Sequence, residues 1–301
     1  MVERPADEHP VRSILVVSRI HIVVIAAMAA LTFSWILTGH QYAALPFIVG
    51  FDWFLVNLLN RVVDLDEDAL NGVVGTSFVD AHAKVISWVG WGALAVSFPV
   101  VHVFFPRLTP FRVLFHLIGV AYNYRIIPSP SGLRRFKELY FFKNFASGAL
   151  FLISGILYPL AAESAFAKVT VVRVLLLAGF YLFMDITYEI FYDLRDLEGD
   201  RRAGVPTFPV VHGEKGARRL VIAFLIGAAL FLLGGYGAGV LRFAEVVMVL
   251  AVVQQALFYV KVVPKGLTQT SCIVVTWLGA AQLLSYNLWV WLGLPLEPWW
   301  H

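Results

Sequence analysis

The stretch YAALPFIVGFDWFLVNLLNRVVDLDED, residues 42–68, decides the class of fold. Residues 42–61 are mostly apolar, and about 20 such residues suffice for one helix to cross the hydrocarbon core of a bilayer. The run passes straight into a cluster of acidic residues that begins at Asp64. This pattern predicts a membrane-spanning helix whose end carries a polar site.

The rest of the chain repeats the apolar pattern. Of its 301 residues, 59% are hydrophobic and only 14% are charged, whereas soluble domains carry about 25% charged residues. We therefore predict an all-α, polytopic membrane protein with nine transmembrane helices around a central cavity that opens laterally to lipid. The nine candidate spans are residues 14–37, 42–61, 84–105, 110–127, 140–161, 169–191, 219–240, 243–264 and 269–293.

We expect a single domain over residues 1–301, with a cytoplasmic tail of about residues 1–12. The spans form two helix groups, about 14–127 and 140–264, followed by the last span at about 269–293. A faint internal repeat supports the two groups. The second and sixth spans each run into an acidic cluster, so that Asp64 and Asp196 stand at corresponding places.

The placement of charge predicts the orientation. The polar stretches 1–12, 62–83, 125–139 and 193–218 fall on one side of the predicted membrane. Counted with the adjoining span ends and the turn between the last two spans, that side holds 18 of the 23 basic residues. By the positive-inside rule, the N-terminus and the acidic loops face the cytoplasm, in a cytoplasmic (inner) membrane. Trp299 and Trp300 are expected to anchor the C-terminus at the opposite interface. The basic residues assigned to that opposite side are Arg107, Arg112, Lys168, Arg173 and Arg242.

Two acidic motifs share one spacing. Asn60, Asp64 and Asp68 are four residues apart, and so are Tyr192, Asp196 and Asp200. On a helix each set forms one stripe. Carboxylates that face one another repel unless a cation lies between them, and oxygen-only ligands suit Mg²⁺. Because Mg²⁺ is commonly shared with substrate phosphates, the two stripes predict a diphosphate site, with basic residues available at Arg19, Lys137 and Arg202.

Other interpretations of the acidic residues fit less well. A solvated charged surface would explain one cluster, but not two clusters with the same spacing at equivalent span ends. An EF-hand is excluded because Ala69 stands where glycine is required and Gly75 where the bidentate glutamate should be. The membrane phosphatidyltransferase class is excluded because its aspartate motif has a glycine and an arginine between the acids, an arrangement that this sequence lacks.

The motifs resemble those of the UbiA superfamily of intramembrane prenyltransferases. The first family motif, N-x-x-x-D-x-x-x-D, is met from Asn60 to Asp68, and the second, D-x-x-x-D, by Asp196 and Asp200. The second lies in YDLRDLEGDRRAGVPTFPV, residues 192–210, which is similar to a longer family string. A third similarity comprises Tyr122, then Arg135-Phe-Lys137, then Asn144.

The resemblance implies roles for individual residues. Asp64, Asp68, Asp196 and Asp200 would be the catalytic residues that hold Mg²⁺. The residues expected to bind substrate are Asn60, Tyr122, Lys137, Asn144, Tyr192, Arg202 and, in place of the family's N-terminal arginine, Arg19. The sequence departs from the family pattern at two places, of which the second, a loop near the mouth of the expected site, concerns the acceptor more than the donor. Ile20 stands where the family has proline, and residues 71–75 lack its basic-proline pair.

The reaction implied is transfer of a prenyl group from an allylic prenyl diphosphate to a lipophilic acceptor, which we expect to be aromatic. A quinone precursor, a tetrapyrrole and a phenol are all compatible with the sequence. Mg²⁺ and basic side chains would stabilise the leaving group, and an apolar cavity would exclude water. Two alternatives remain open: a UbiA-type membrane terpene cyclase and a cation or metabolite transporter. Membrane lipid is an expected partner, and nucleic acid is not.

Three further acids are candidates for binding the acceptor or taking its proton. Asp52 precedes Asp64, and Asp185 precedes Asp196, by about three helical turns, so both lie well inside their spans. Ionisable groups at this depth are commonly functional. Asp193, beside the second motif, is the third candidate. A neutral, hydrogen-bonded acid between helices is an equally good explanation for the two deep aspartates.

Overall fold

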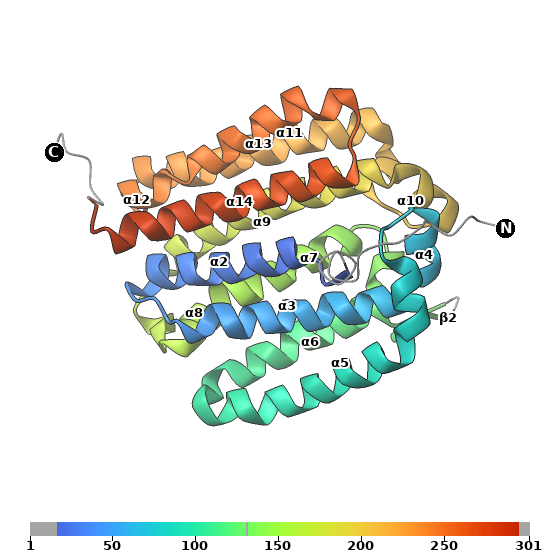
Figure 1. Ribbon diagram of the computed structural model, residues 1–301. Coiled ribbons are helices and arrows are strands. Elements are labelled where there is room, and N and C mark those ends of the chain that lie inside the picture. The colour runs from blue at the N-terminus through green and yellow to red at the C-terminus, as the bar shows by residue number, and fades with distance from the viewer. Residues whose placement is uncertain (1–16, 131, 295–301) are drawn as a thin grey trace.

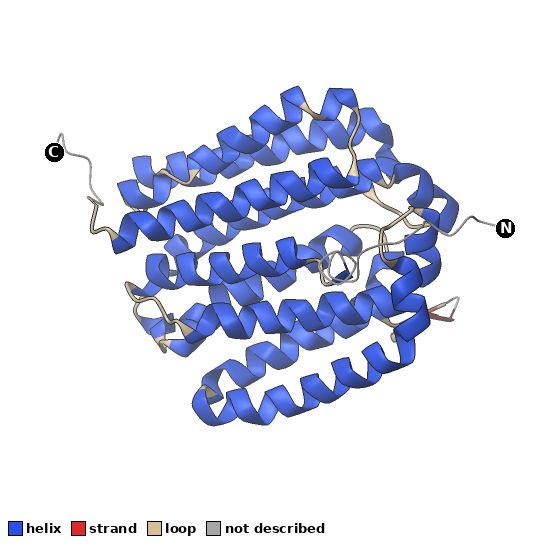
Figure 2. Cartoon of the chain, in the orientation of Figure 1, coloured by secondary structure: helices blue, strands red, loops and turns tan. Residues whose placement is uncertain are grey.

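A computed structural model describes residues 17–130 and 132–294. Long helices lie side by side in a bundle, and the short elements between them gather at the two ends (Figures 1 and 2). The expected tail 1–12, the start of the first predicted span and the aromatic pair Trp299 and Trp300 lie outside the described residues. The predicted all-α membrane class is confirmed.

The long helices are α2 (Ile20–Thr38), α3 (Ala44–Val63), α5 (Thr76–Phe104), α6 (Thr109–Asn123), α7 (Phe142–Leu152), α9 (Val171–Arg195), α11 (Phe208–Gly237), α13 (Val249–Lys261) and α14 (Gln269–Trp291). A π-helical turn, η3 (Ile153–Leu157), joins α7 to α8 (Tyr158–Ala162). The short elements are α4 (Leu65–Leu70), α10 (Leu197–Ala203), α12 (Phe243–Val246), η1 (Pro106–Leu108), η2 (Phe136–Glu138), η4 (Ala165–Ala167) and η5 (Val263–Lys265). One small antiparallel hairpin pairs β1 (Ile127–Ser129) with β2 (Gly132–Arg134).

Eight helical segments among the described residues are long and apolar enough to cross a membrane. The predicted count of nine is not confirmed, because the fourth predicted span is the 15-residue helix α6. A helix of that length rises about 22 Å, less than the ~30 Å hydrocarbon core. In Figure 1, α6 nevertheless runs back alongside α5 and contacts α3, so the chain returns to the end that carries α4 and α10.

The internal repeat extends to the backbone. When Asp64 is aligned with Asp196, the ends of α3 and α9, the starts of α4 and α10 and the starts of α5 and α11 all coincide. The turns after the short helices also match, since Val73 N–H donates to the Asp68 carbonyl and Val205 N–H to the Asp200 carbonyl. Each half therefore builds the same helix, bend and helix around its acidic motif.

The buried apolar side chains form two clusters. One lies among α9, α11 and α13 and includes Leu177, Phe191 and Leu232. The other joins α3 and α6 to the α7–α8 segment and includes Trp53 and Phe115. Helix α2 contributes residues to both clusters, so it packs between the two groups of helices.

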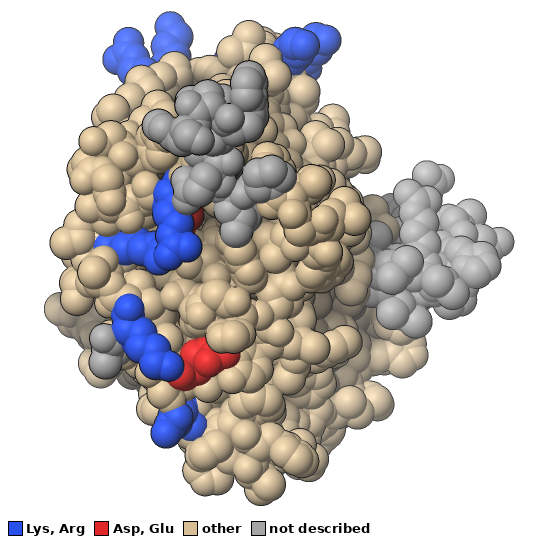
Figure 3. Space-filling model, turned by 90° about the vertical axis from the view of Figure 1, so that its left-hand side faces the viewer, with Lys and Arg blue, Asp and Glu red and all other residues tan. Residues whose placement is uncertain are grey.

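Large apolar side chains also cover the outside of the bundle. Trp88, Phe104 and Leu230 are mostly exposed, as expected for side chains that face lipid. The end of the molecule opposite α4 and α10 shows mostly uncharged side chains with a few charged groups (Figure 3). Arg112, which the charge count assigns to the side opposite the acidic loops, is only 1% exposed, because it lies inside the bundle and pairs with Asp52.

Candidate functional site

The two acidic motifs bend at their first aspartate. Helix α3 ends just before Asp64, which has φ −101° and ψ 21°, and α9 ends just before Asp196, which has φ −93° and ψ 8°. Both conformations lie outside the helical region, so the predicted continuous helical stripe is wrong in detail. The two aspartates of each motif nevertheless remain one helical turn apart, because Asp68 N–H donates to the Asp64 carbonyl and Asp200 N–H donates to the Asp196 carbonyl.

A glycine allows the two bends to meet. The Asn71 side chain lies so close to Gly199 that a Cβ at position 199 would be 1.6 Å from Asn71 Oδ1. Asn71 follows α4 and Gly199 is in α10, and the two short helices contact one another. A Cβ at position 199 would require the Asn71 side chain to move, so glycine permits the contact between the two short helices as it stands.

Between the bends lies a polar pocket of about 140 Å³. All four motif aspartates line it, together with the acids Glu67, Glu189 and Asp193 and the bases Arg19, Arg61, Lys137, Lys143 and Arg195. Asp64, Asp68 and Asp200 are buried, and Asp200 is only 1% exposed. The aspartates therefore face the interior of a shared pocket rather than bulk solvent.

Each motif aspartate binds a basic side chain. Asp64 lies 2.9 Å from Arg135 and 2.6 Å from Lys137. Asp68 lies 2.7 Å from Arg61, Asp196 pairs with Arg195, and Asp200 lies 3.1 Å from Lys143. Within the described residues, no three His, Cys, Asp or Glu side chains are grouped closely enough to hold a metal ion. The pocket thus brings the aspartates together, with cationic side chains in direct contact with each.

The protonation of Asp200 responds to this environment. Burial raises the pKa of its carboxyl to about 6, and the nearby Asp193 and Asp196 carboxylates act in the same direction, whereas Lys143 opposes them. The ion pair with Lys143 therefore lowers the pKa of Asp200 by less than burial and the neighbouring carboxylates raise it. A cation placed among these carboxylates would favour the charged form.

Most of the predicted substrate-binding residues reach this pocket. Arg19, Asn60, Tyr122 and Tyr192 line both it and the larger cavity described below, and Lys137 lines the polar pocket. The Asn60 amide donates to Asp64 Oδ2 at 2.6 Å, which ties the first two residues of the motif together. The four shared side chains lie where the two cavities adjoin.

Two predicted binding residues lie elsewhere. Arg202 is exposed and does not line the pocket. Asn144 is buried and donates to Asp193 Oδ2 at 2.6 Å, while Lys143 lies 2.7 Å from Asp193 Oδ1. Asp193 lines the polar pocket, but its carboxylate is occupied by these two neighbours. Asn144 and Asp193 therefore help to position Lys143, and neither of them lines the large cavity.

Several residues to which the sequence assigns no role also line the polar pocket, among them Arg61, Glu67, Asn71, Lys143, Glu189 and Arg195. Arg61 follows Asn60 directly, and Lys143 precedes Asn144 directly, so each stands next to a residue that the motifs singled out. Glu189 lies about two turns before Asp196 in the sequence. Helical spacing places both residues on one face, so this spacing is a signal that predicts Glu189 as a further lining residue.

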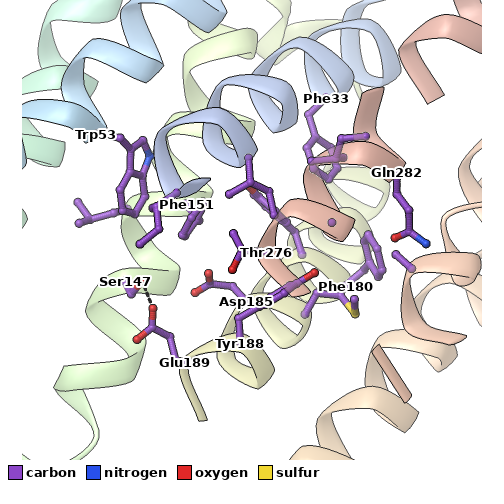
Figure 4. Close-up of a pocket in the computed structure, with 18 of the residues that line it drawn as sticks. Phe33, Trp53, Ser147, Phe151, Phe180, Asp185, Tyr188, Glu189, Thr276 and Gln282 are labelled. Carbon is purple, nitrogen blue, oxygen red and sulfur yellow. Dashed lines mark hydrogen bonds between the residues drawn. The ribbon is translucent and has the colours of Figure 1, made fainter. Parts of the chain in front are cut away.

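A larger, mainly apolar cavity of about 460 Å³ lies beyond the polar pocket. Equivalent faces of the two halves line it: Trp53, Val56, Asn57 and Asn60 on α3, and, at the corresponding positions of α9, Asp185, Tyr188, Glu189 and Tyr192. Figure 4 shows several of these side chains around the cavity. Leu250 and Ser285 line the cavity and are also exposed on the outer surface, so it opens laterally beside α13 and α14.

The two deep aspartates have different surroundings. Asp52 is fully buried and does not line either of these cavities. It binds Arg112 through both carboxylate oxygens, at 2.9 and 2.5 Å, and also contacts His116 and Tyr158. Asp185 lines the large cavity, and its Oδ2 has no hydrogen-bond partner. Of the two, the structure brings only Asp185 to the cavity.

Comparison with known proteins gives a consistent result. The model of the UbiA prenyltransferase family matches residues 20–272. Digeranylgeranylglyceryl phosphate synthase of Methanothermobacter thermautotrophicus is 41% identical over 73 residues, which are 22% of this chain and 26% of that protein. The Halobacterium salinarum enzyme of the same name is 29% identical over 203 residues, 62% of this chain and 63% of the relative. The matches thus span less than two thirds of the length of these relatives.

Solved structures share the fold. A UbiA homologue from Archaeoglobus fulgidus, bound to GPP and Mg²⁺, superposes with a TM-score of 0.70 at 15% identity, covering 92% of this chain and 98% of that one. The apo structure of a UbiA homologue from Aeropyrum pernix K1 gives 0.62 at 15% identity, covering 90% and 99%. At this identity the similarity is evidence for the arrangement of helices.

Proposed function

The chain belongs to the UbiA prenyltransferase family, and from this membership we propose that it transfers a prenyl group from an allylic prenyl diphosphate to a lipophilic acceptor. The observation that carries the proposal is the junction of the two cavities. Arg19, Asn60, Tyr122, Glu189 and Tyr192 line both the polar pocket and the apolar cavity. A prenyl diphosphate needs these two environments in contact, one for the charged group and one for the hydrocarbon tail.

The donor set of the polar pocket fits Mg²⁺, with Asp64, Asp68, Asp196 and Asp200 as the proposed ligands. Carboxylate oxygens are the ligands that this ion prefers, and each aspartate already binds a cationic side chain. Bound with the diphosphate, Mg²⁺ would stabilise the negative charge that develops on the leaving group. The Archaeoglobus fulgidus homologue, which contains Mg²⁺ with a prenyl diphosphate, supports this assignment.

The side chains of the pocket have complementary roles in the proposed reaction. Lys137 and Lys143, which now bind Asp64 and Asp200, are placed to turn toward the diphosphate oxygens. The Asn60 amide is a further donor at the junction. The apolar wall, which includes Phe151 and Phe180, would keep water away from the allylic cation once diphosphate has left.

Two acceptor classes are compatible with the cavity. The sequence favours an aromatic acceptor, such as a quinone precursor, a tetrapyrrole or a phenol. The names of the archaeal relatives favour a second candidate, an alcohol of a prenylated glyceryl phosphate. Both classes are lipophilic, and both would enter from the membrane beside α13 and α14, where Leu250 and Ser285 connect the cavity with the outer surface.

We place the enzyme in the cytoplasmic membrane with the polar pocket toward the cytoplasm. The support for this orientation is the concentration of basic residues in the loops at the end that carries α4 and α10. In this orientation the water-soluble part of the donor, the diphosphate, enters from the cytoplasm. Both halves supply aspartates to one pocket, which supports a single catalytic domain.

The test compares lipids from cells that express wild-type protein, Asp64→Ala or Asp66→Ala. Asp66 lies between the motif aspartates but is exposed and does not line the pocket, so it is a matched control. Mass spectrometry should find the same prenylated product with wild type and Asp66→Ala and none with Asp64→Ala. Identical lipids in all three strains would contradict the proposal.

Purified protein separates the alternatives. A terpene cyclase would release diphosphate and form a hydrocarbon product with no acceptor present. A transporter would move solute across proteoliposomes without Mg²⁺-dependent release of diphosphate. A prenyltransferase should release diphosphate in step with formation of a prenylated acceptor.

A further inference from the structure

Two acidic side chains face the large cavity from one side of α9. Asp185 and Glu189 are the acidic residues among those that line it, and Arg19 is the basic one, within the part of the chain that the structure describes. The equivalent positions on α3 hold Trp53 and Asn57. Figure 4 shows both carboxylates on the α9 side of the cavity, with Tyr188 beside them. The acidic character of the cavity therefore comes from one half of the molecule.

Asp185 has unused hydrogen-bonding capacity. Its side chain is buried, at 6% exposure, and Oδ2 has no partner. Four other buried polar atoms that belong to residues lining the same cavity also lack partners: Asn57 Nδ2, Tyr181 Oη, Gln282 Oε1 and Tyr286 Oη. Buried polar groups are normally hydrogen-bonded, so this set is incomplete without a ligand. A hydrocarbon tail would leave all five atoms unsatisfied, whereas a molecule with polar groups could bind to some of them.

Glu189 lies at the junction of the two cavities. It lines both of them, and its Oε1 accepts a hydrogen bond from Ser147 Oγ at 2.9 Å (Figure 4). A prenyl diphosphate that spans the junction places C1, the carbon bonded to the diphosphate, close to this point. Asp185 lies one helical turn further into the cavity, about 6 Å along the axis. Glu189 is therefore next to the reacting carbon, and Asp185 is next to the space beyond it.

We propose that Asp185 and Glu189 form the acceptor site, which takes a hydroxyl-bearing lipophilic molecule. Asp185 accepts a hydrogen bond from the acceptor, and Glu189 takes its proton. This proposal rests on the proposed prenyl transfer. The C1–oxygen bond of the donor breaks, and its electron pair leaves with the diphosphate. The acceptor forms the new bond to C1 with its own electron pair, and its proton passes to the Glu189 carboxylate. Ser147 is a positioning residue, because it acts by orienting Glu189.

Carbodiimide labelling tests the site without requiring turnover. Dicyclohexylcarbodiimide modifies carboxyl groups that are reachable from the membrane and free of an ion pair. We expect mass spectrometry of the full chain in lipid nanodiscs to find the label on Asp185 and Glu189 but not on Asp52, which binds Arg112. A long-chain alkylphenol or a 1-O-alkyl glyceryl phosphate should suppress the labelling. If neither residue is labelled, or if neither compound protects them, the acceptor site lies elsewhere.

Steady-state kinetics tests the roles, with geranyl diphosphate, Mg²⁺ and the same two acceptors. Glu189→Gln should lower kcat about 10²- to 10³-fold, within the range for a lost general base, with the KM for donor within about twofold of wild type. Asp185→Asn should raise the KM for acceptor about tenfold, the effect of losing roughly one hydrogen bond to a charged group. Glu214→Gln, an exposed residue outside both cavities, is the matched control.

The outcomes separate this inference from the proposed function. Wild-type values of kcat and of the KM for acceptor in both variants would overturn the acceptor site, provided that wild type transfers the prenyl group. If wild type releases no diphosphate from geranyl diphosphate with Mg²⁺, the proposed function fails. The labelling and protection experiment then still decides whether Asp185 and Glu189 bind the acceptor.

Discussion

Helices α3 and α9 are built to the same plan but use their deep aspartates differently. Each helix ends in a bend at a motif aspartate, and each carries another aspartate about three turns earlier, Asp52 on α3 and Asp185 on α9. Asp52 is enclosed by Arg112, His116 and Tyr158. Asp185 lines the cavity, and one of its oxygens has no partner. One acid stabilises the packing of helices, and the other is available to a ligand.

A difference of one residue in register explains this contrast. When the two halves are aligned on Asp64 and Asp196, Asp185 corresponds to Trp53, which lines the cavity, and not to Asp52. Consecutive residues on an α-helix point about 100° apart. Asp52 is therefore turned away from the cavity toward α6, where Arg112 lies. The depth of an acidic residue in a span indicates that it has a structural or a functional role. The face of the helix on which the residue lies decides which of the two roles it has.

The largest effect is expected from breaking the enclosed pair. Asp52→Asn leaves Arg112 buried without its counter-charge, and losing one partner of a buried ion pair costs about 3–5 kcal/mol. Asp185→Asn removes a carboxylate that has no cationic partner, so the free energy of unfolding should be unchanged or slightly higher. Thermal unfolding in detergent measures both. Equal destabilisation by the two substitutions would show that the contrast between the helices is wrong.

The motif aspartates should be equivalent in catalysis. Asp64→Ala and Asp196→Ala each remove a carboxylate from the polar pocket, and we expect diphosphate release to fall about 10²- to 10³-fold, roughly 2.7–4 kcal/mol of lost transition-state stabilisation. The double variant should be little worse than either single one, because the groups act as a unit. If the fold-decrease in diphosphate release in the double variant equals the product of the two single decreases, the two halves act independently.

A smaller effect is expected where the two bends meet. Gly199→Ala places a methyl group against the Asn71 side chain, and overpacking of this kind costs about 1–3 kcal/mol. We expect the concentration of Mg²⁺ needed for half-maximal activity to rise, because the two pairs of aspartates are pushed apart. Adding Asn71→Ala makes room for the methyl group and should restore much of the loss. A failure of this rescue would mean that Asn71 has a separate role.

The smallest effect concerns pH. Because burial raises the pKa of Asp200 to about 6, its carboxyl is largely protonated below pH 6 and cannot bind a metal ion. The apparent affinity for Mg²⁺ should be constant above that pH and fall below it, by up to about tenfold per pH unit for one competing proton. Isothermal titration from pH 5 to 8 measures this. Asp200→Asn should abolish the step, and a step that persists would belong to another group.

The fold and the location of the site could be predicted because they depend on simple patterns. Apolar runs of span length and two acidic clusters with one spacing are visible in the sequence, and residues 42–68 contain both signals. The bends at Asp64 and Asp196 could not be predicted, because a four-residue spacing is equally compatible with an unbroken helix. The roles assigned to the site residues remain predictions until they are tested by mutation.

Long-range partners account for the other differences. The burial of Arg112 could not be predicted, because nothing local to it indicates that Asp52, 60 residues earlier, neutralises it inside the bundle. The end of α6 also differs from the prediction. An apolar stretch of residues 110–127 predicts a full span, but the helix stops at Asn123, whose side chain accepts a hydrogen bond from Asn60.

The lateral opening beside α13 and α14 has a consequence for kinetics. Leu250 and Ser285 line the cavity and also reach the outer surface, so a lipophilic acceptor meets the protein by diffusing within the plane of the bilayer. The quantity that governs saturation is then the mole fraction of acceptor in the lipid and not its concentration in the aqueous phase. Diluting the membrane with inert phospholipid slows such an enzyme even when the total amount of acceptor stays the same.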